Sequence, residues 1–316
     1  MALDLSVVIP TYNGTERIPA VLDRLKQQNT PASISWEVLV VDNNSDDHIA
    51  ELISDYQHSW LEHVPLRYML ESRQGTAYAR QCGVENTSGN FIGFIDDDNW
   101  PVESWVAKAV EFGRHMPKAG AFGSRVIGAF EQEPDETVKP LLTFLAVRDI
   151  GKSPKQFYPS KLQLPAGAGL VVRRDAWMES IPSVLKNISR PGEDYEISVR
   201  LAKKGWEIWY NPEMQVEHFI PANRLERTYL LKLAHLYGAC TCNLLMLQNP
   251  EWKKSYVLGK AFLGSLRRIL AHQIRYPWYE HQNLEAECQL AFHMGNLKSP
   301  ILYLLNRFDR LAREFP

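Results

Sequence analysis

The stretch GNFIGFIDDDN (residues 89–99) places three adjacent aspartates directly after an apolar run. Residues 91–95 have the composition of a buried strand. Neighbouring carboxylates repel one another, so Asp96, Asp97 and Asp98 are costly at the end of such a strand unless a cation neutralises them. A divalent metal that prefers oxygen ligands, Mg²⁺ or Mn²⁺, would do this. The alternative interpretation is an exposed acidic turn, which is common in loops.

Strands that end in polar residues recur in the first hundred residues, with helical patterns between them. The strand patterns cover 5–13, 36–47, 66–70 and 89–99, and the helical patterns cover 15–28, 48–57 and 75–87. This alternation indicates a parallel sheet of βαβ units, and the continuously apolar strands indicate that helices cover both faces. Polar clusters at 11–13, 42–45 and 96–99 should therefore converge at the carboxyl edge of the sheet, where open α/β sheets bind ligands.

The rest of the chain is less regular and ends in helices. We expect a helix at 105–116, a glycine-rich strand at 119–130, a strand within 166–177, a helix at 192–205, two short strands within 206–219 and helices from about 225 onward. The predicted fold class is α/β, with a Rossmann-like, mostly parallel sheet flanked by helices and a C-terminal helical extension. We predict one domain at 1–221 and the helical extension at 222–316.

Composition indicates a globular protein of enzyme size. The 316 residues are 45% hydrophobic and 23% charged, which argues against disorder. The formal net charge is −2, but residues 222–316 carry 13 Lys and Arg against 7 Asp and Glu. The four cysteines lack the spacing of a metal site, and the N-terminus lacks the features of a secretory signal. Since no run of about 18 apolar residues occurs, we expect no spanning helix. Reduced, buried cysteines are typical of a cytosolic protein, so we expect a cytoplasmic location and leave attachment to the inner face of the membrane open.

Six motifs, in order, resemble those of the family 2 glycosyltransferases, which are inverting enzymes of the GT-A fold. The motifs are VVIPTYNG, VLVVDNNSDD, RQGTAYARQCGVENTSGNFIGFIDDDN, GAGLVVRR, GED and VEHF. The resemblance covers roughly residues 4–220, about two-thirds of the chain. It is specific for the family and uninformative about the sugar. It implies that residues 1–221 are a GT-A catalytic domain.

The resemblance implies a pocket for a nucleoside diphosphate sugar. Tyr12 would line the nucleotide pocket, Glu16 would lie near the ribose, and Asp42 would accept a hydrogen bond from the base, usually uracil. Asn43 stands where many relatives have a second aspartate, so the contact with the base could be shared or altered. The residues implied at the donor are Pro10, Thr11, Tyr12, Asn13, Glu16, Asp42, Asn43, Arg73, Gly75, Asp96, Asp97, Gly167 and Gly169.

The resemblance also implies a divalent metal, Mn²⁺ or Mg²⁺, at the acidic strand end. Asp98 is our choice of metal ligand within the D-x-D motif, and Asp96 is the second candidate. His218 matches the family histidine that helps to hold the metal or the diphosphate, although a lone histidine is more often structural. For Arg80, a structural ion pair is as good an interpretation as direct contact with the nucleotide.

Glu193 and Asp194 are the candidate catalytic acids. Acids near a helix N-terminus also stabilise the helix, which is the structural alternative. The resemblance implies that Asp194 is the general base that takes the proton from the acceptor hydroxyl. Gly167 and Gly169 would let the backbone approach the donor sugar or the acceptor, because they have no Cβ atom.

Residues 253–279 have the pattern of a basic amphipathic helix that can lie on an anionic membrane surface. The cations share one helix face, and Tyr276, Trp278 and Tyr279 favour a membrane interface. The cations are Lys253, Lys254, Lys260, Arg267, Arg268 and Arg275. A helix that packs on the catalytic domain with a solvated basic face, or one that forms a dimer interface, would show the same pattern.

The sequence therefore predicts a metal-dependent inverting glycosyltransferase. It would move a sugar from a nucleoside diphosphate, with UDP favoured, to a glycan or lipid-linked glycan in exopolysaccharide or cell-envelope synthesis. We expect no nucleic-acid partner, and the sequence leaves open whether the protein forms a homo-oligomer. The alternatives are a nucleotide-sugar-binding pseudoenzyme or assembly subunit, and a nucleotidyltransferase. The nucleotidyltransferase is weakened because no glycine-rich nucleotide loop follows the first strand.

Overall fold

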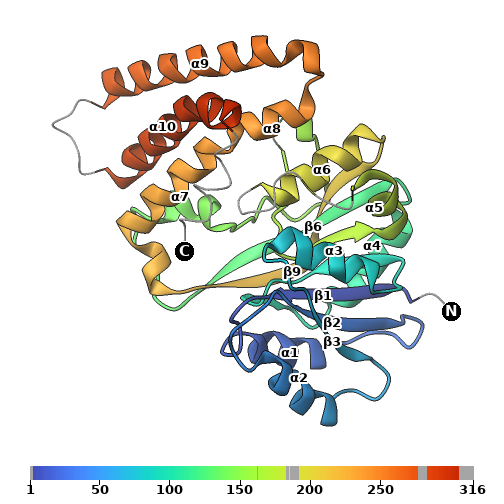
Figure 1. Cartoon of the computed structure of the whole chain (residues 1–316). Helices are drawn as coiled ribbons and strands as arrows, with labels where there is room; N and C mark the ends of the chain where they lie inside the picture. Colours follow the sequence, from blue (N-terminus) through green and yellow to red (C-terminus); the bar gives the residue numbers. More distant parts are fainter. Residues whose placement is uncertain (1–2, 162, 183–184, 186–191, 277–282, 306–316) are drawn as a thin grey trace. The chain divides into compact units, whose positions relative to one another are not determined.

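The computed structural model describes residues 3–161, 163–182, 185, 192–276 and 283–305, in two compact units (Figure 1). The first unit comprises Met1–Ala129, Ala146–Ile188 and Ile197–Phe219. The second comprises Phe130–Leu145, Ser189–Glu196 and Ile220–Pro316. The chain therefore passes between the two units several times, rather than once near residue 221.

A nine-stranded sheet in the described residues forms the centre of the first unit. Its strands are β1 (Leu5–Thr11), β2 (Trp36–Asp42), β3 (Leu66–Leu70), β4 (Phe91–Phe94), β5 (Asn99–Pro101), β6 (Ala119–Phe130), β7 (Lys155–Phe157), β8 (Leu170–Arg173) and β9 (Glu207–Ile220). The order is β3-β2-β1-β4-β8-β6-β9-β5, and β7 pairs with β9. The predicted α/β class is confirmed, and the sheet is mixed.

The parallel part of the sheet brings the polar strand ends together. β1 pairs in parallel with β2 and with β4, and Thr11 lies directly opposite Asp42. Beyond β4, the backbone N–H of Ile95 donates to the carbonyl of Val8 at 3.1 Å, so the aspartates leave the sheet beside the end of β1. The predicted convergence at the carboxyl edge is confirmed.

The other part of the sheet is antiparallel and corrects two expectations. Residues 206–219 were expected to form two short strands, but β9 is one strand of 14 residues. Its partners change along its length, because it pairs with β7 near Tyr210 and with β5 near His218. Residues 89–99 were expected to form one strand, but β4 ends at Phe94 and Asn99 begins β5. A local pattern shows neither the change of partner nor the turn between these strands.

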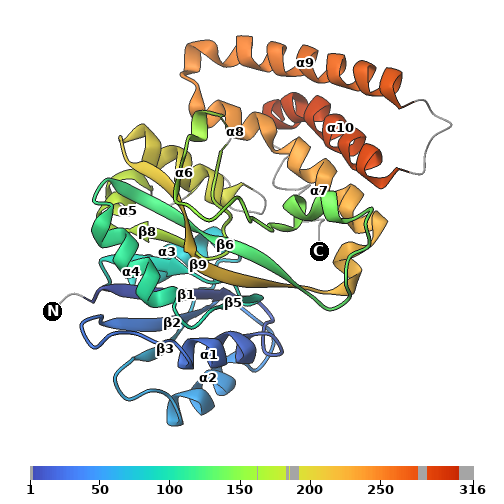
Figure 2. The same cartoon turned by 180° about the vertical axis from the view of Figure 1, so that it is seen from behind.

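Helices cover both faces of the sheet, because the strand residues alternate between two cores. The helices of the first unit are α1 (Ile18–Lys26), α2 (Ile49–His58), α3 (Thr76–Glu85), α4 (Trp105–His115), α5 (Arg174–Ser180) and most of α6 (Glu193–Lys203). Val7 and Ile9 belong to the core that includes α1, α2 and α4. Val8, between them, belongs to the core that includes α3, α5 and α6 (Figures 1 and 2).

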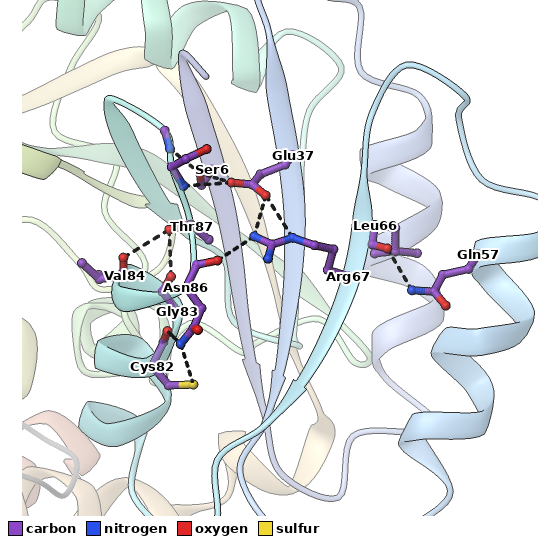
Figure 3. Close-up of polar contacts among 12 residues, drawn as sticks. Ser6, Glu37, Gln57, Leu66, Arg67, Cys82, Gly83, Val84, Asn86 and Thr87 are labelled. Atoms are coloured by element: carbon purple, nitrogen blue, oxygen red, sulfur yellow. Dashed lines mark hydrogen bonds and ion pairs between the residues drawn. The ribbon is translucent and has the colours of Figure 1, made fainter. Parts of the chain in front are cut away.

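A buried carboxylate sits at the amino end of the parallel strands (Figure 3). Glu37 is 4% exposed and faces Ser6 across the β1–β2 ladder. Its oxygens accept hydrogen bonds from the Ser6 hydroxyl at 2.7 Å, the Ser88 N–H at 3.1 Å and the Arg67 guanidinium at 2.6 and 3.1 Å. The guanidinium also donates to the carbonyl of Asn86 at 2.7 Å. This cluster ties β1, β2, β3 and the end of α3 together.

The second unit is helical, as predicted for the C-terminal extension. Its elements are η1 (Lys139–Leu145), η3 (Ala222–Leu225), α7 (Arg227–Ala239), α8 (Thr241–Gln248), η4 (Glu251–Lys253), α9 (Lys254–Arg275) and α10 (Leu284–Leu304); η2 (Pro159–Lys161) belongs to the first unit. α7 and α10 cross closely, because a Cβ at Gly238 would lie 2.1 Å from the Phe292 carbonyl oxygen. Among the described residues, the stretch Arg227–Gln248 is long and apolar enough to span a membrane by length and composition alone, and half of its most apolar window is buried.

Candidate active site

The loop after β1 and the loop after β2 hold each other at the carboxyl edge. The Asn13 backbone N–H donates to the Ser45 hydroxyl at 3.0 Å, and the Asp46 N–H donates to the Asn13 side-chain oxygen at 2.9 Å. Asn13 and Asn44 both have positive φ angles, of 48° and 62°. Asparagine tolerates this conformation better than most residues, so the polar clusters also shape the loops.

Asp97 is bound by Thr11, the last residue of β1, and by Arg17, just before α1. The Arg17 guanidinium donates to its two carboxylate oxygens at 3.1 and 2.9 Å, and the Thr11 hydroxyl donates at 2.8 Å. Burial raises the pKa of Asp97, and the guanidinium of Arg17 opposes that shift. Gly14 is necessary here, because a Cβ at this position would lie 2.0 Å from the Thr11 Oγ1 atom and 2.6 Å from Asp97. Asp97 therefore fastens the loop that follows β1.

Asp96 pairs with a second arginine. The Nη2 atom of Arg80 lies 3.3 Å from the Asp96 carboxylate, and the Arg80 side chain is only 4% exposed. The guanidinium carbon also lies 5.2 Å from the centroid of the Phe94 ring. This contact is the structural ion pair that the sequence left as an alternative for Arg80.

Asp98 lies beside His218, 120 residues later in the chain. The two side chains are 3.4 Å apart, from the His218 Nε2 atom to an Asp98 carboxylate oxygen, and both are almost buried. The β5–β9 ladder sets this contact, because Asn99 lies opposite His218 and the Phe219 N–H donates to the Asp98 carbonyl at 2.8 Å. The structure thus brings together two of the three predicted metal ligands, Asp98 and His218.

The side chains around Asp98 suit a bound cation. Asp96 pairs with Arg80 and Asp97 with Arg17, and the Asp98 carboxylate faces the His218 imidazole and accepts a hydrogen bond from the Asn99 side-chain amide at 2.9 Å. A carboxylate oxygen and an imidazole nitrogen are both ligands that Mn²⁺ accepts. Among the described residues, no group of three or more His, Cys, Asp or Glu is arranged to hold a metal. Asp98 and His218 would supply two ligands, which fits a cation that also binds substrate phosphates.

Asp42 and Asn43 have different surroundings although they are adjacent and both buried. The Asp42 carboxylate accepts from the Ser45 N–H at 2.9 Å and from the Tyr68 hydroxyl at 2.7 Å. Burial raises the pKa of Tyr68 well above its usual value, and the hydrogen bond to Asp42 adds to this. Asp42 therefore faces a neutral phenol donor from β3.

Asn43 clamps the loop after β3. Its amide nitrogen donates to the carbonyl oxygens of Glu71 at 3.3 Å and Arg73 at 2.7 Å, and its amide oxygen accepts from the Gly75 N–H at 2.7 Å. A carboxylate could accept the last of these bonds but could donate neither of the others. This explains why an asparagine suits this position in the present chain.

Arg73 belongs to the same loop and is held by neighbouring side chains. Its guanidinium donates to both carboxylate oxygens of Glu71 at 2.9 and 2.8 Å, and it lies 4.7 Å from the centroid of the Tyr78 ring. The hydrogen bond from Arg73 lowers the pKa of Glu71. Gly75 precedes α3 with a φ of 138°, a region that favours glycine. The Arg73 side chain is 54% exposed, so part of it faces solvent.

The remaining predicted donor residues occupy varied environments. Pro10 is buried in β1, whereas Tyr12 and Glu16 are exposed in the loop after it. Gly167 is half-buried and its carbonyl accepts from the Leu170 N–H at 3.2 Å. Gly169 has a φ of 66°, and a Cβ there would lie 2.4 Å from the Ser124 Oγ atom. The protein's own packing therefore already requires glycine at 169.

Glu193 and Asp194 form the first turn of α6 and belong to the second unit. Glu193 is 3% exposed, and Asp194 is half-buried. The Asp194 carboxylate accepts from the N–H of Tyr195 at 3.0 Å. Burial raises the pKa of Cys240 to about 12, and the charge of Asp194 adds to this shift. Asp194 thus lies near α7 and α8 within its own unit.

Sequence reasoning missed three residues of the cluster. Arg17, Gly14 and Tyr68 belong to none of the chemistry assigned from the motifs, yet they contact Asp97 and Asp42. Gly14 lies inside the motif VVIPTYNG, so its position was a usable signal. Arg17 and Tyr68 carried no local signal, because their partners are 80 and 26 residues away.

Comparison with known proteins identifies the family of this chain. The family model described as "Glycosyl transferase family 2" matches residues 6–179, more than half of the chain. The chain belongs to glycosyl transferase family 2, which confirms the family predicted from its motifs. The match includes the three aspartates and ends before Asp194 and His218.

Several curated proteins resemble part of the chain. Glycosyltransferase AglE of Haloferax volcanii is 36% identical over 107 residues, 34% of each protein. The uncharacterized glycosyltransferase YfnE of Bacillus subtilis is 27% identical over 193 residues, 60% of this chain and 47% of YfnE. The amylovoran biosynthesis glycosyltransferase AmsB of Erwinia amylovora is 34% identical over 102 residues, 31% of this chain and 32% of AmsB. The chain thus spans about a third to a half of the length of these relatives.

Solved structures share the fold over nearly the whole chain. The mannosyltransferase PcManGT from Pyrobaculum calidifontis, in complex with GDP-Man and Mn²⁺, has a TM-score of 0.59 at 16% identity and covers 95% of this chain and 87% of its own. TarS 1-349 of S. aureus has a TM-score of 0.53 at 15% identity and covers 99% and 92%. At these identities the likeness shows the fold, a GT-A sheet with helical additions.

Proposed function

We propose that this protein is a metal-dependent inverting glycosyltransferase. It moves a sugar from a nucleoside diphosphate, with UDP favoured, to a glycan or lipid-linked glycan acceptor in exopolysaccharide or cell-envelope synthesis. The observation that carries the proposal is the contact at the sheet edge between Asp98, in the run of three aspartates, and His218, which lies 120 residues later in the chain. Names such as amylovoran biosynthesis glycosyltransferase support a polysaccharide acceptor.

In this proposal the first unit binds the nucleotide-sugar donor. Asp98 and His218 would hold the divalent metal, which supplies Lewis-acid stabilisation of the diphosphate leaving group. Asp42 accepts a hydrogen bond from the base, and the Asn13 loop lines the nucleotide. The related folds with bound GDP-Man and Mn²⁺ or with UDP-GlcNAc (TM-score 0.51) support a nucleotide sugar as the donor class.

Asp194 is the general base of the proposal. It takes the proton of the acceptor hydroxyl while that oxygen bonds to the anomeric carbon from the face opposite the leaving diphosphate, and the carbon–oxygen bond to the diphosphate breaks. A single displacement inverts the configuration and leaves no covalent enzyme intermediate. The assignment rests on the GED motif at the start of α6, which also places Glu193 beside the base. A cytoplasmic location, where nucleotide sugars occur, belongs to the same proposal.

Thermal unfolding with a panel of nucleotides tests the donor site. UDP or a UDP-sugar should raise the melting temperature of the wild type with Mn²⁺ and not with EDTA, because a ligand of the folded state stabilises it by mass action. The variant Asp98→Ala should lose the shift, whereas Asp55→Ala, an exposed aspartate of α2, should keep it. If no nucleotide shifts the wild type with any metal, the proposal is wrong and the nucleotide-sugar-binding alternatives lose support with it.

A transfer assay separates an enzyme from a binding subunit. Asp194→Asn should keep the nucleotide-dependent shift and lose about 10³-fold in transfer rate, within the usual range for a general base. A wild type that binds UDP-sugar with metal, but neither hydrolyses nor transfers the sugar with any glycan acceptor, would instead support the pseudoenzyme or assembly-subunit reading.

A further inference from the structure

Helix α9 has one side packed inside the second unit and another side that faces outward. It packs against α10 and α8, and α10 packs in turn against α7, as Figures 1 and 2 show. The packed side includes Ser265 and His272, both buried, and the His272 Nε2 atom lies 2.9 Å from the Ala286 carbonyl oxygen at the start of α10. The two buried residues of α9 are therefore a small residue and a polar one.

The outward side of α9 carries its four most exposed large apolar side chains. Tyr256 is 70% exposed, Leu263 66%, Leu270 58% and Ile274 83%. At about 100° per residue these four positions fall within roughly 40° of one another, and they span roughly 27 Å along the helix. The sequence pattern predicts that the cations share one helix face. In the structure, the apolar row also faces outward. The row is an uncovered apolar surface of the kind that marks an interaction site.

Positive charge borders the row without any compensating acid on the helix. Lys260 and Arg267 are exposed and lie next to the row on the helical wheel, about 20–80° from its members. Residues 254–275 contain no Asp or Glu. Just before the helix, Trp252 is 78% exposed and the Lys253 ammonium lies 4.7 Å from the centroid of its indole ring. Trp278 and Tyr279, which the sequence analysis added to this surface, lie outside the described residues.

We propose that the outward row of α9, with Lys260 and Arg267, binds the surface of an anionic lipid bilayer. The apolar row would enter the interface, and the cations beside it would meet lipid phosphates. Trp252 suits the level of the headgroups, where tryptophan is enriched. A second copy of this chain is the weaker candidate, because pairing of two α9 helices would bring their cations together with no carboxylate on either helix.

This surface makes use of neither Asp98 nor Asp194, so its test is independent of transfer. The full-length protein is mixed with vesicles of phosphatidylcholine alone, or of equal parts phosphatidylcholine and phosphatidylglycerol, and the vesicles are floated on a density gradient. The protein should float with the anionic vesicles at low salt and much less at high salt, because salt screens the cations. With phosphatidylcholine alone, it should stay largely at the bottom of the gradient.

Matched variants measure separately how the positive charges and the apolar row contribute to vesicle binding. Lys260→Ser with Arg267→Ser should weaken partition to anionic vesicles about thirtyfold, since each basic residue near such a surface contributes about fivefold. Lys203→Ser with Lys204→Ser makes the same change in exposed residues of the first unit and should leave it unchanged. Leu263→Ser with Ile274→Ser should weaken partition at least about a hundredfold, whereas Met178→Ser, at an exposed methionine of α5, should not.

The folding of each variant is checked by its melting temperature and its nucleotide-dependent shift. Wild-type protein that never floats with anionic vesicles overturns the proposal. Equal partition of the Lys260/Arg267 and Lys203/Lys204 variants overturns it as well. A wild type that is dimeric by light scattering and becomes monomeric in the Leu263/Ile274 variant, without floating in either state, would assign the surface to a second copy instead.

Discussion

Buried carboxylates occupy both ends of the parallel strands, and their surroundings differ. At the amino end, Glu37 faces one arginine, one hydroxyl and one backbone N–H, so a single negative charge meets a single positive charge. At the carboxyl end, three adjacent aspartates lie together; Arg17 and Arg80 pair with two of them, and Asp98 contacts His218 and Asn99. One end holds a single carboxylate, whereas the other gathers three adjacent carboxylates.

We interpret Glu37 as a carboxylate that stabilises the fold and Asp98 as a carboxylate that binds a ligand. A buried charge whose donors are all supplied by the protein contributes to the fold, and removing its partner is costly. Adjacent carboxylates repel one another, so a cation that binds beside them lowers the energy of the folded protein. Glu37 and Asp98 therefore make a matched pair for experiment, because both are buried acids at the ends of the same sheet.

The largest expected effect belongs to the variant Asp98→Asn. Transfer should fall by at least about 10³-fold, because losing several kcal/mol of stabilisation of the diphosphate charge costs a factor of ten for each 1.4 kcal/mol. The free energy of unfolding without metal should stay the same or rise, because the substitution removes a like charge from the cluster. Steady-state transfer rates and urea denaturation measure the two quantities.

Glu37→Gln is the control for the opposite end of the sheet. It should lower the free energy of unfolding and leave the transfer rate of the folded protein nearly unchanged. If Asp98→Asn destabilises the protein as much as Glu37→Gln does, Asp98 is a structural residue and the contrast between the two ends fails.

The next largest effect should follow from Arg67→Met. This change leaves Glu37 buried without its cation, and we expect the free energy of unfolding to fall by about 2–3 kcal/mol. This is at or somewhat below the usual cost of breaking a buried ion pair, because the Arg67 side chain is 42% exposed. The double variant Glu37→Gln/Arg67→Met should recover part of this loss, since no uncompensated charge remains. Urea denaturation of the four proteins of this cycle measures the coupling. Additive losses would mean that the pair has no energetic coupling.

Asn43→Asp should cost less, about 1–2 kcal/mol, from a different cause. The new carboxylate would face the carbonyl oxygens of Glu71 and Arg73, to which the amide now donates, so two hydrogen bonds would be replaced by repulsion. The loop from 71 to 75 should loosen, and the nucleotide-dependent thermal shift should shrink with it. An unchanged melting temperature and an unchanged shift would mean that the clamp contributes nothing. Asp46→Asn, in the neighbouring exposed loop, is the control.

The contrast also shows how far the sequence could predict this site. The convergence of the residue 11, 42 and 96–98 clusters was predictable, because parallel strands place their carboxyl ends at one edge. The family motifs, moreover, named Asp98 and His218. The contact between these two was not predictable from spacing, because it depends on the register of β5 against a β9 strand that was expected to be two strands.

Other contacts could not be predicted from the sequence either, because their residues are far apart along the chain. Arg17 and Asp97 are 80 residues apart, and Glu37 and Arg67 are 30 residues apart, so no local pattern links either pair. For α9, periodicity sorts the residues into faces but does not tell which face another helix covers. Only the packing of α10 on Ser265 and His272 decides that the apolar row faces outward.

The smallest effect concerns the pH dependence of the Glu71–Arg73 pair. The hydrogen bond from Arg73 lowers the pKa of Glu71 below the usual 4.5, so the ionised pair adds stability above pH 4.5 that is lost as the pH falls through the lower folded-state value. The free-energy difference between wild type and Glu71→Gln should thus be present at neutral pH and vanish in acid. The effect is small because water screens the exposed guanidinium. Urea denaturation across the acid range measures it, and a difference that grows toward low pH would show that the pair does not hold Glu71 ionised.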